Sequence, residues 1–276
     1  MRLGQVFASL EAEILAVGEE SESLAFVYRS LKQLSLTDFV FKLQTEAVRE
    51  DIDLLEGLTQ QLKDHLPAQY ILGWADFYGL RLSVDERVLI PRIETEELVD
   101  LILAENPDSG QQVLDLATGS GAIALALAGH RPSWQVTASD ISSQALDLAR
   151  ENARRLQTKV DFIQSDVFDR LNQTYDIIVS NPPYIAQEDK EEVGLNVLIS
   201  EPHLALFAAE NGYAIYNKIA ESAEQHLTEQ GKIYLEIGYK QGEIVADLFQ
   251  KHFPTKRVRV LKDQFGQDRK VVVDNG

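Results

Sequence analysis

The sequence contains no cysteine, which excludes disulfides, thiolate metal sites and cysteine nucleophiles. Positive charge is also scarce: 26 Lys and Arg residues stand against 44 Asp and Glu residues, a formal net charge of −18. Proteins normally meet nucleic acids with a basic patch, and no such patch is evident here. We therefore expect no direct nucleic-acid binding. The acidity fits either simple solubility or a basic protein partner.

Long hydrophobic runs are missing as well. No apolar stretch approaches the roughly 20 residues of a membrane-spanning helix. The N-terminus lacks the basic segment and apolar core of a secretory signal. We expect a monomer in the cytoplasm, without membrane contact. The five histidines are scattered and form no cluster with metal-ligand spacing, so no metal is predicted.

The first part of the chain reads as helical. Residues 1–75 carry apolar side chains at helical spacing and no convincing strand, which predicts a small domain of four or five helices. Binding of a partner is its natural role, and a purely structural cap is the alternative. Residues 76–92 are predicted to form a linking β-hairpin with Asp85-Glu86 at its turn.

Residues 93–276 are predicted to form the second domain. Strand-like segments and helical segments alternate here; the strand-like segments are 113–117, 136–140, 160–163, 176–179 and 232–237. Such alternation predicts a doubly wound parallel sheet with right-handed crossovers. Two last strands, joined by a turn at Gly266, form an antiparallel pair at the edge. The fold class is therefore α/β, with a seven-stranded, mostly parallel sheet.

A glycine loop follows the first strand of this sheet. It reads Asp115-Leu116-Ala117-Thr118-Gly119-Ser120-Gly121, and its glycines let the backbone turn tightly and approach a ligand. The third glycine of a dinucleotide-binding loop is absent, because Ala124 stands there. Asp115 would repel a phosphate and attract an ammonium or sulfonium group. A tight structural turn is the alternative.

Acidic residues end the next two strands. Asp140 can bind both hydroxyls of a ribose, although it can also serve as the N-terminal charge of the following helix. In Asp166-Val167-Phe168, the carboxylate and a backbone amide can read an adenine edge and the phenyl ring can cover its face. Asp166 could also be an ordinary turn residue. Together the three strand ends favour a nucleoside with a positively charged, non-phosphate tail, such as S-adenosylmethionine.

The fourth strand runs directly into Ser180-Asn181-Pro182-Pro183-Tyr184. Both prolines fix φ near −65° and cannot donate a hydrogen bond, so the segment is stiff, extended and rich in free carbonyl groups. A turn that only stops the strand is the alternative. Ligands of open α/β sheets bind beyond the carboxyl ends of the strands, where this segment is expected to lie.

With these motifs the chain resembles the class I methyltransferases and, more narrowly, the release-factor glutamine N5-methyltransferase family. The residues that carry the resemblance are 69–73, 90–96, 115–121, Asp140, 181–184, 201–202, 205–206 and 266–269. Two positions depart from the family pattern: Ile93 replaces a proline and Ala117 replaces a glycine. The second departure costs little unless that residue needs a positive φ.

The resemblance implies S-adenosylmethionine as cofactor and the glutamine of the Gly-Gly-Gln loop of class I peptide release factors as substrate. Asn181, Pro182 and Tyr184 are then catalytic, with Asn181 also touching the cofactor. The side-chain carbonyl of Asn181 and the backbone carbonyl of Pro182 would accept the two N–H bonds of the glutamine amide. Pro183 and Tyr184 would line the slot that holds this amide. Two alternatives remain: an N-methyltransferase of nucleic-acid bases, and a catalytically inactive adaptor that binds the cofactor. Segment 185–209 could be a mobile lid or a packing element.

Overall fold

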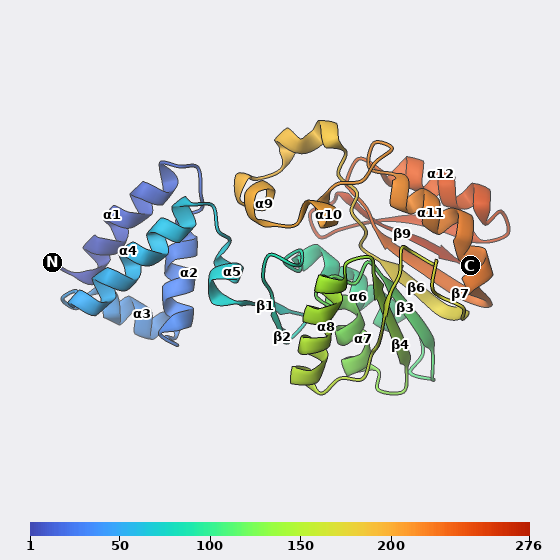
Figure 1. Ribbon diagram of the computed structural model, residues 1–276, viewed down its shortest axis with the longest axis horizontal. Helices are drawn as coiled ribbons and strands as arrows, with labels where there is room; N and C mark the ends of the chain where they lie inside the picture. The colour runs from blue at the N-terminus through green and yellow to red at the C-terminus, as the bar shows by residue number, and fades with distance from the viewer.

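The structure is a computed structural model that describes residues 1–276. Its N-terminal part consists of five helices, α1 (Leu3–Leu15), α2 (Glu22–Leu31), α3 (Leu36–Leu43), α4 (Arg49–Lys63) and α5 (Ala68–Leu72). Apolar side chains at helical spacing, among them Leu24, Leu55 and Leu58, meet in a core made only of residues from this part. Figure 1 shows these helices as a separate body at one end of the molecule. No helix of the chain has the length and apolarity needed to cross a membrane.

A short hairpin joins the two parts. It pairs β1 (Trp74–Phe77) with β2 (Leu80–Ser83). Its turn lies at Tyr78 and Gly79, both of which have positive φ, +47° and +75°. Consecutive residues with positive φ match the right-handed twist of paired strands. The predicted position of the hairpin turn, Asp85-Glu86, was wrong. These residues lie in a separate turn after the hairpin, where the N–H of Val88 donates to the carbonyl of Asp85 and the Asp85 side chain accepts from Arg87.

The second part is built on one seven-stranded sheet. Its strands are β3 (Gln112–Leu116), β4 (Gln135–Asp140), β5 (Asp161–Gln164), β6 (Tyr175–Ser180), β7 (Leu227–Glu236), β8 (Arg257–Lys262) and β9 (Asp268–Asp274). The order across the sheet is β5-β4-β3-β6-β7-β9-β8, and only β9 runs antiparallel to its neighbours. The prediction of a mostly parallel, doubly wound sheet is confirmed.

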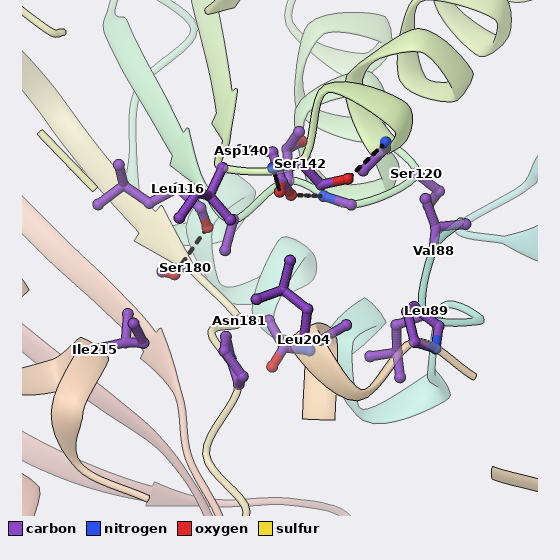
Figure 2. A pocket seen from close by; sticks show the side chains of 18 of the residues that line it. Val88, Leu89, Leu116, Ser120, Asp140, Ser142, Ser180, Asn181, Leu204 and Ile215 are labelled. Carbon is purple, nitrogen blue, oxygen red and sulfur yellow. Dashed lines mark hydrogen bonds between the residues drawn. The ribbon is translucent and has the colours of Figure 1, made fainter. Parts of the chain in front are cut away.

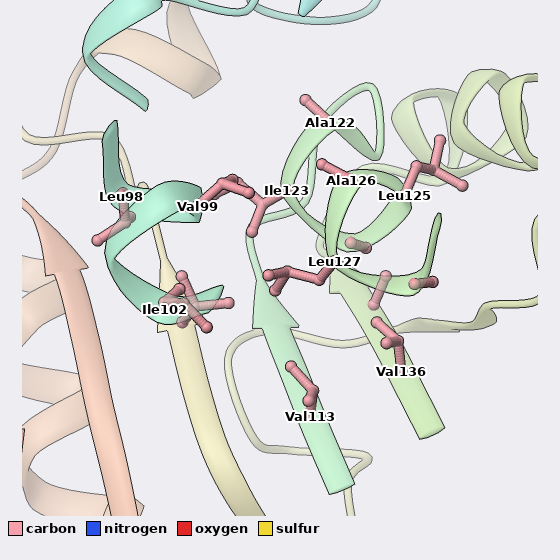
Figure 3. Packing of buried hydrophobic residues seen from close by; sticks show 14 of the residues in the cluster. Leu98, Val99, Ile102, Val113, Ala122, Ile123, Leu125, Ala126, Leu127 and Val136 are labelled. Carbon is pink, nitrogen blue, oxygen red and sulfur yellow. The ribbon is translucent and has the colours of Figure 1, made fainter. Parts of the chain in front are cut away.

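Helices cover both faces of this sheet. They are α6 (Ile93–Glu105), α7 (Ala122–His130), α8 (Ser143–Leu156), α11 (Ala214–Ser222), the 3-10 helix η2 (Ala223–His226) and α12 (Gly242–His252). α7 has apolar side chains all round and is buried almost completely. Figure 3 shows how α6 and α7 pack on β3 and β4 through Ile102, Leu127 and Val113. On the other face, α11 and α12 pack through Ile219 and Phe249.

The segment between β6 and α11 interrupts the alternation. It contains the 3-10 helix η1 (Gln187–Glu192) and the short helices α9 (Leu195–Ser200) and α10 (His203–Leu206). In Figure 1 it arches from the sheet toward the N-terminal helices. The contact is direct, because the Ser200 hydroxyl donates to the backbone carbonyl of His65 at 2.9 Å.

The strand order reverses at one position in the sheet, between β3 and β6. β3 pairs with β4 on one side and with β6 on the other, so the chain reverses its direction across the sheet between β3 and β6. The loops that follow such a pair diverge to opposite faces and leave a crevice at the carboxyl ends of the strands. The glycine loop follows β3 and the Asn-Pro-Pro-Tyr segment follows β6, so both border this crevice.

Candidate active site

A cavity of about 450 Å³ lies at these strand ends. Figure 2 shows side chains from β3, β6, the loop before α6 and the segment around α10 around it. The predicted site residues that line it are Ala117, Thr118, Gly119, Ser120, Asp140, Asp166, Val167, Asn181 and Pro183. Asp115, Gly121, Phe168, Pro182 and Tyr184 are near it but do not line it.

Asp115 supports the glycine loop from beneath. It is fully buried, and one carboxylate oxygen accepts from the Thr118 hydroxyl at 2.6 Å and from the backbone N–H of Ala124 at 3.1 Å. The other oxygen has no partner. Burial raises the pKa of this carboxyl to about 7. This placement differs from the prediction that Asp115 faces a cationic ligand: the side chain shapes the loop instead.

The loop itself has an unusual backbone. Ala117, Gly119 and Gly121 all have positive φ, at +57°, +55° and +83°. Gly121 is also closely packed, since a Cβ there would lie 3.1 Å from the side chain of Leu125. Glycine is therefore needed at 121 for conformation and for space. Alanine at 117 replaces the glycine of the family pattern and has a positive φ, so this replacement does carry a conformational cost.

Asp140 ties the loop to the end of β4. One oxygen of its carboxylate accepts from the backbone N–H of Gly119 and the other from that of Ser142, both at 2.9 Å. Burial raises the pKa of this carboxyl, and these N–H donors act in the opposite direction. Ser142 caps α8 as predicted, accepting from the N–H of Ala145. The carboxylate of Asp140 is thus fixed at the cavity wall with spare acceptor capacity.

The third strand end is arranged differently from the prediction. The Asp166 carboxylate pairs with Lys218 of α11 at 2.6 Å, and Lys218 itself lines the cavity. Val167 has φ of +48°, which is a strained conformation for a β-branched residue. The ring of Phe168 stacks on His226 with centroids 4.5 Å apart and lies outside the cavity lining. Phe168 therefore does not offer a face to a ligand here.

The Asn-Pro-Pro-Tyr segment brings an amide to the cavity. Asn181 donates through Nδ2 to the Thr95 hydroxyl at 3.0 Å, and its side chain makes no other hydrogen bond. No group of the protein donates to the backbone carbonyl of Pro182. Two carbonyl acceptors of adjacent residues are thus left without partners.

Tyr184 belongs to the support of this segment. Its ring packs against the core beneath α11 and α12 rather than lining the cavity. Burial raises the pKa of its hydroxyl to about 12. Its backbone carbonyl accepts from Gln241 at 3.0 Å. Gly212 passes so close to this carbonyl that a Cβ would lie 2.2 Å from it, which leaves no room for another residue there.

Several residues at the site carried no signal strong enough to be singled out from the sequence. Thr95 and Lys218 both line the cavity, but neither stands in a local pattern that marks it as a site residue. Arg92 lines the cavity and pairs with Glu201 at 2.6 Å, joining the loop before α6 to the segment between α9 and α10. Glu236 could have been noticed, because a glutamate that ends an apolar, buried strand is unusual.

Comparison with known proteins agrees with this geometry. Residues 95–208 match the family model described as methyltransferase small domain. The chain is 63% identical over 277 residues to a release factor glutamine methyltransferase of Streptococcus pneumoniae, covering 100% of this chain and 99% of the relative. It is 51% identical over 255 residues to the protein of the same name from Lactococcus lactis, covering 92% and 94%.

A solved structure supports the fold alone. A methyltransferase from Pyrococcus furiosus superposes with a TM-score of 0.54 at 20% identity, covering 72% of this chain and 90% of that one. The relative from Streptococcus pneumoniae covers the whole chain, so the likeness to it includes the helical N-terminal part. By its sequence over the full length and by the fold that carries the site, the chain belongs to the release factor glutamine methyltransferase family.

Proposed function

We propose that the chain methylates the side-chain amide nitrogen of a glutamine in class I peptide release factors, in the Gly-Gly-Gln loop. The observation that carries the proposal is a pair of unpartnered carbonyl acceptors on adjacent residues, the side chain of Asn181 in the cavity wall and the backbone of Pro182 next to it. A primary amide has two N–H donors, so it can satisfy both acceptors at once. A secondary amide or a hydroxyl offers only one.

The cavity fits S-adenosylmethionine, the cofactor of this class of methyltransferase. The glycine loop lacks the third glycine of a dinucleotide-binding loop, where Ala124 stands, and Asp140 supplies a fixed carboxylate suited to ribose hydroxyls. Backbone N–H groups of Gly119 and Ser142 hold that carboxylate in place before a ligand arrives. When bound, S-adenosylmethionine supplies a methyl group on a positively charged sulfur.

Asn181 and Pro182 act on the amide that enters. Their carbonyl oxygens accept its N–H bonds, which draws electron density toward the nitrogen and fixes its direction. Fixed acceptors of this kind need no reorganisation during the reaction, and correct orientation alone removes much of the barrier. Pro183 lines the slot, and the two prolines keep its backbone stiff.

Methyl transfer to a purified release factor tests the proposal. Incubation with labelled cofactor is expected to label the factor at its Gly-Gly-Gln glutamine, identified by mass spectrometry of the peptide. Asn181→Ala is expected to lower turnover by at least about 100-fold, because a fixed acceptor is lost. Cofactor affinity should stay within about threefold, since Asn181 is only one of many cavity residues.

Asn275→Ala is the matched control, because Asn275 is exposed near the C-terminus and does not line the cavity; its side chain hydrogen-bonds only to Glu229, Gln230 and Lys256. It should leave turnover unchanged. Labelling of RNA in place of the release factor would contradict the proposal and favour a base methyltransferase.

A further inference from the structure

Asn181 is the end of a short chain of buried polar groups. Its Nδ2 donates to the Thr95 hydroxyl at 3.0 Å, and that hydroxyl donates to the carboxylate of Glu236 at 2.6 Å. Thr95 lies in the first turn of α6, and Glu236 is the last residue of β7. Both side chains are buried, with 4% and 2% of the residue exposed. Residues from three distant parts of the sequence thus meet behind the amide.

The number of hydrogen-bond donors on Thr95 determines the orientation of the Asn181 side-chain amide. A threonine hydroxyl has a single proton, and the carboxylate of Glu236, when ionised, can only accept. The proton of Thr95 is therefore committed to Glu236, and Thr95 can offer Asn181 only a lone pair. Asn181 must then turn its NH₂ group toward Thr95, which leaves its carbonyl oxygen on the side of the cavity. The opposite rotamer would place two acceptors against each other.

The surroundings of Glu236 decide whether it is ionised. Burial outweighs the hydrogen bond from Thr95 and the positive charges of Arg269 and Lys270, which act in the opposite direction, and the pKa of its carboxyl is raised to about 7. Glu94 adds a smaller upward effect. The ionised form therefore prevails above pH 7. A hydrogen bond of 2.6 Å is typical of a charged acceptor.

We propose that Thr95 and Glu236 are positioning residues, which hold the Asn181 amide with its carbonyl oxygen toward the incoming substrate. Neither needs to touch the glutamine, since each acts through the next group in the chain. The inference rests on the function proposed above and names residues that control the orientation of the acceptor. It also gives a reason for burying a glutamate at the end of β7, where a hydrophobic residue would pack at lower cost.

The first test replaces the hydroxyl of Thr95. Thr95→Val keeps the shape and removes the donor and acceptor, so the Asn181 amide is free to turn. We expect kcat with the release factor to fall by about 10- to 100-fold, with the KM for S-adenosylmethionine within about threefold. Thr95→Ser keeps the hydroxyl and should restore kcat to within about threefold of the wild type.

Thr59 of α4 provides a matched control. It is as buried as Thr95, at 3% exposed, and its hydroxyl has no partner. Thr59→Val makes the same chemical change in the N-terminal core and should leave kcat unchanged. A merely structural role of Thr95 would predict that the fall in kcat of Thr95→Val only reflects a loss of folded protein, and a folded fraction that accounts for the whole fall would overturn the proposal.

A double-mutant cycle isolates the route through Asn181. If Thr95 acts by orienting this amide, Thr95→Val should have less than a twofold effect on kcat in the Asn181→Ala background, because the oriented group is already gone. Full additivity of the two effects would overturn the proposal. Single-turnover rates at enzyme excess keep the weak variants measurable.

Glu236 is tested by a pair of substitutions. Glu236→Gln keeps an oxygen that can accept from Thr95 and is expected to lie within about tenfold of the wild-type kcat. Glu236→Met keeps the length and removes the acceptor, so Thr95 can donate to the Asn181 carbonyl instead, and kcat should fall as far as in Thr95→Val. Equal activity of the Met and Gln variants would overturn the role of Glu236; if the Met variant does not fold, the Thr95 series decides alone.

The outcomes separate the two proposals. If the wild-type protein fails to methylate the release factor, the proposed function fails whatever the variants do. If the wild type is active and Thr95→Val is equally active, only the positioning role fails.

Discussion

Two non-glycine residues in the cavity wall, Ala117 and Val167, have a left-handed backbone conformation, with φ of +57° and +48°. Side chains with a Cβ meet the following carbonyl in this conformation, at a cost of roughly 1–2 kcal/mol per residue. Strain of this kind persists where the surrounding structure determines the backbone. Here the hydrogen bond from Gly119 to Asp140 holds the loop that contains Ala117.

Ala117→Gly is expected to stabilise the protein by about 1 kcal/mol, because glycine adopts this φ without the steric cost. Thermal unfolding followed by circular dichroism checks this, and the midpoint should rise by a few degrees. Ala8→Gly, an exposed position inside α1, is the opposite control and should destabilise by about 1 kcal/mol. A fall in stability for Ala117→Gly would show that alanine is not strained there.

Asp115 makes stability depend on pH in an identifiable way. Its pKa is raised to about 7 by burial, so the folded state binds a proton more tightly than the unfolded chain does. The carboxyl carries no penalty below about pH 4, where it is protonated in both states. The free energy of unfolding then falls as pH rises to 7, by at most about 1.4 kcal/mol per pH unit.

Asp115→Asn should remove this component, because asparagine stays neutral and can still accept from Thr118 and Ala124. Urea titrations from pH 4 to 8 are expected to show the wild type losing stability relative to the variant up to about pH 7, and a constant difference above it. Asp108→Asn, whose side chain is 69% exposed, should run parallel to the wild type. Parallel curves for Asp115→Asn would mean that Asp115 is not protonated near neutrality.

Among the elements, the segment with η1, α9 and α10 depends on one buried glutamate. Glu201 has 1% of its side chain exposed and accepts from Arg92 at 2.6 Å and from the backbone N–H of Ile90 at 3.0 Å. The two bonds join this segment to the loop before α6, and both sides line the cavity near Arg92 and Pro202. These two bonds thus fasten the segment to the cavity wall at Glu201.

Glu201→Ala is expected to lower the free energy of unfolding by about 2 kcal/mol, because the N–H of Ile90 is left buried without a partner. Hydrogen exchange should quicken across residues 187–206, and the KM for the release factor should rise. Glu192→Ala is the control in the same segment: its ion pair with Lys240 is half exposed on both sides, so about 0–1 kcal/mol is expected. Unchanged exchange in Glu201→Ala would refute this fastening role.

The sequence predicted which strand ends meet, but not how each side chain is used there. Local patterns predict the alternating strands and helices. Because the carboxyl ends of parallel strands lie at one edge of a sheet, they also predict that Gly119, Asp140 and Asn181 lie close together. The burial of Asp115 and the pairing of Asp166 with Lys218 depend on packing between distant residues. No local pattern contains that information.

The hairpin illustrates the same limit at the scale of an element. Asp85-Glu86 was predicted as the hairpin turn, whereas the hairpin turn forms at Tyr78-Gly79 and Asp85-Glu86 belongs to a separate turn. Glycine at 79 was the stronger local signal for a turn with positive φ. In contrast, Ile93 is the first residue of α6, a position that favours proline but tolerates other residues, so that departure from the family pattern disturbs nothing nearby.

At the scale of the whole molecule, the N-terminal helices and the sheet domain have separate cores. The core of the helices contains buried residues only up to Ala68, and the cores of the sheet domain begin at Ala75. Few contacts join them, among them the hydroxyl of Tyr70 donating to the carbonyl of Val88 and that of Ser200 donating to His65. Such an arrangement allows the helical part to serve partner recognition while the cavity does the chemistry, a role we propose for residues 1–75.

Removal of residues 1–72 tests this division of labour. The shortened protein should fold, because it keeps every buried residue of the sheet-domain cores and loses only the Tyr70 side chain at their edge. It should methylate a short Gly-Gly-Gln peptide with kcat within about threefold of the full chain. With the intact release factor its KM should rise at least about tenfold, since contacts of the helical part are lost. Cofactor binding by calorimetry and a cooperative thermal transition verify folding. An equal loss of activity on peptide and protein would favour a structural cap, and no loss on either would exclude a recognition role.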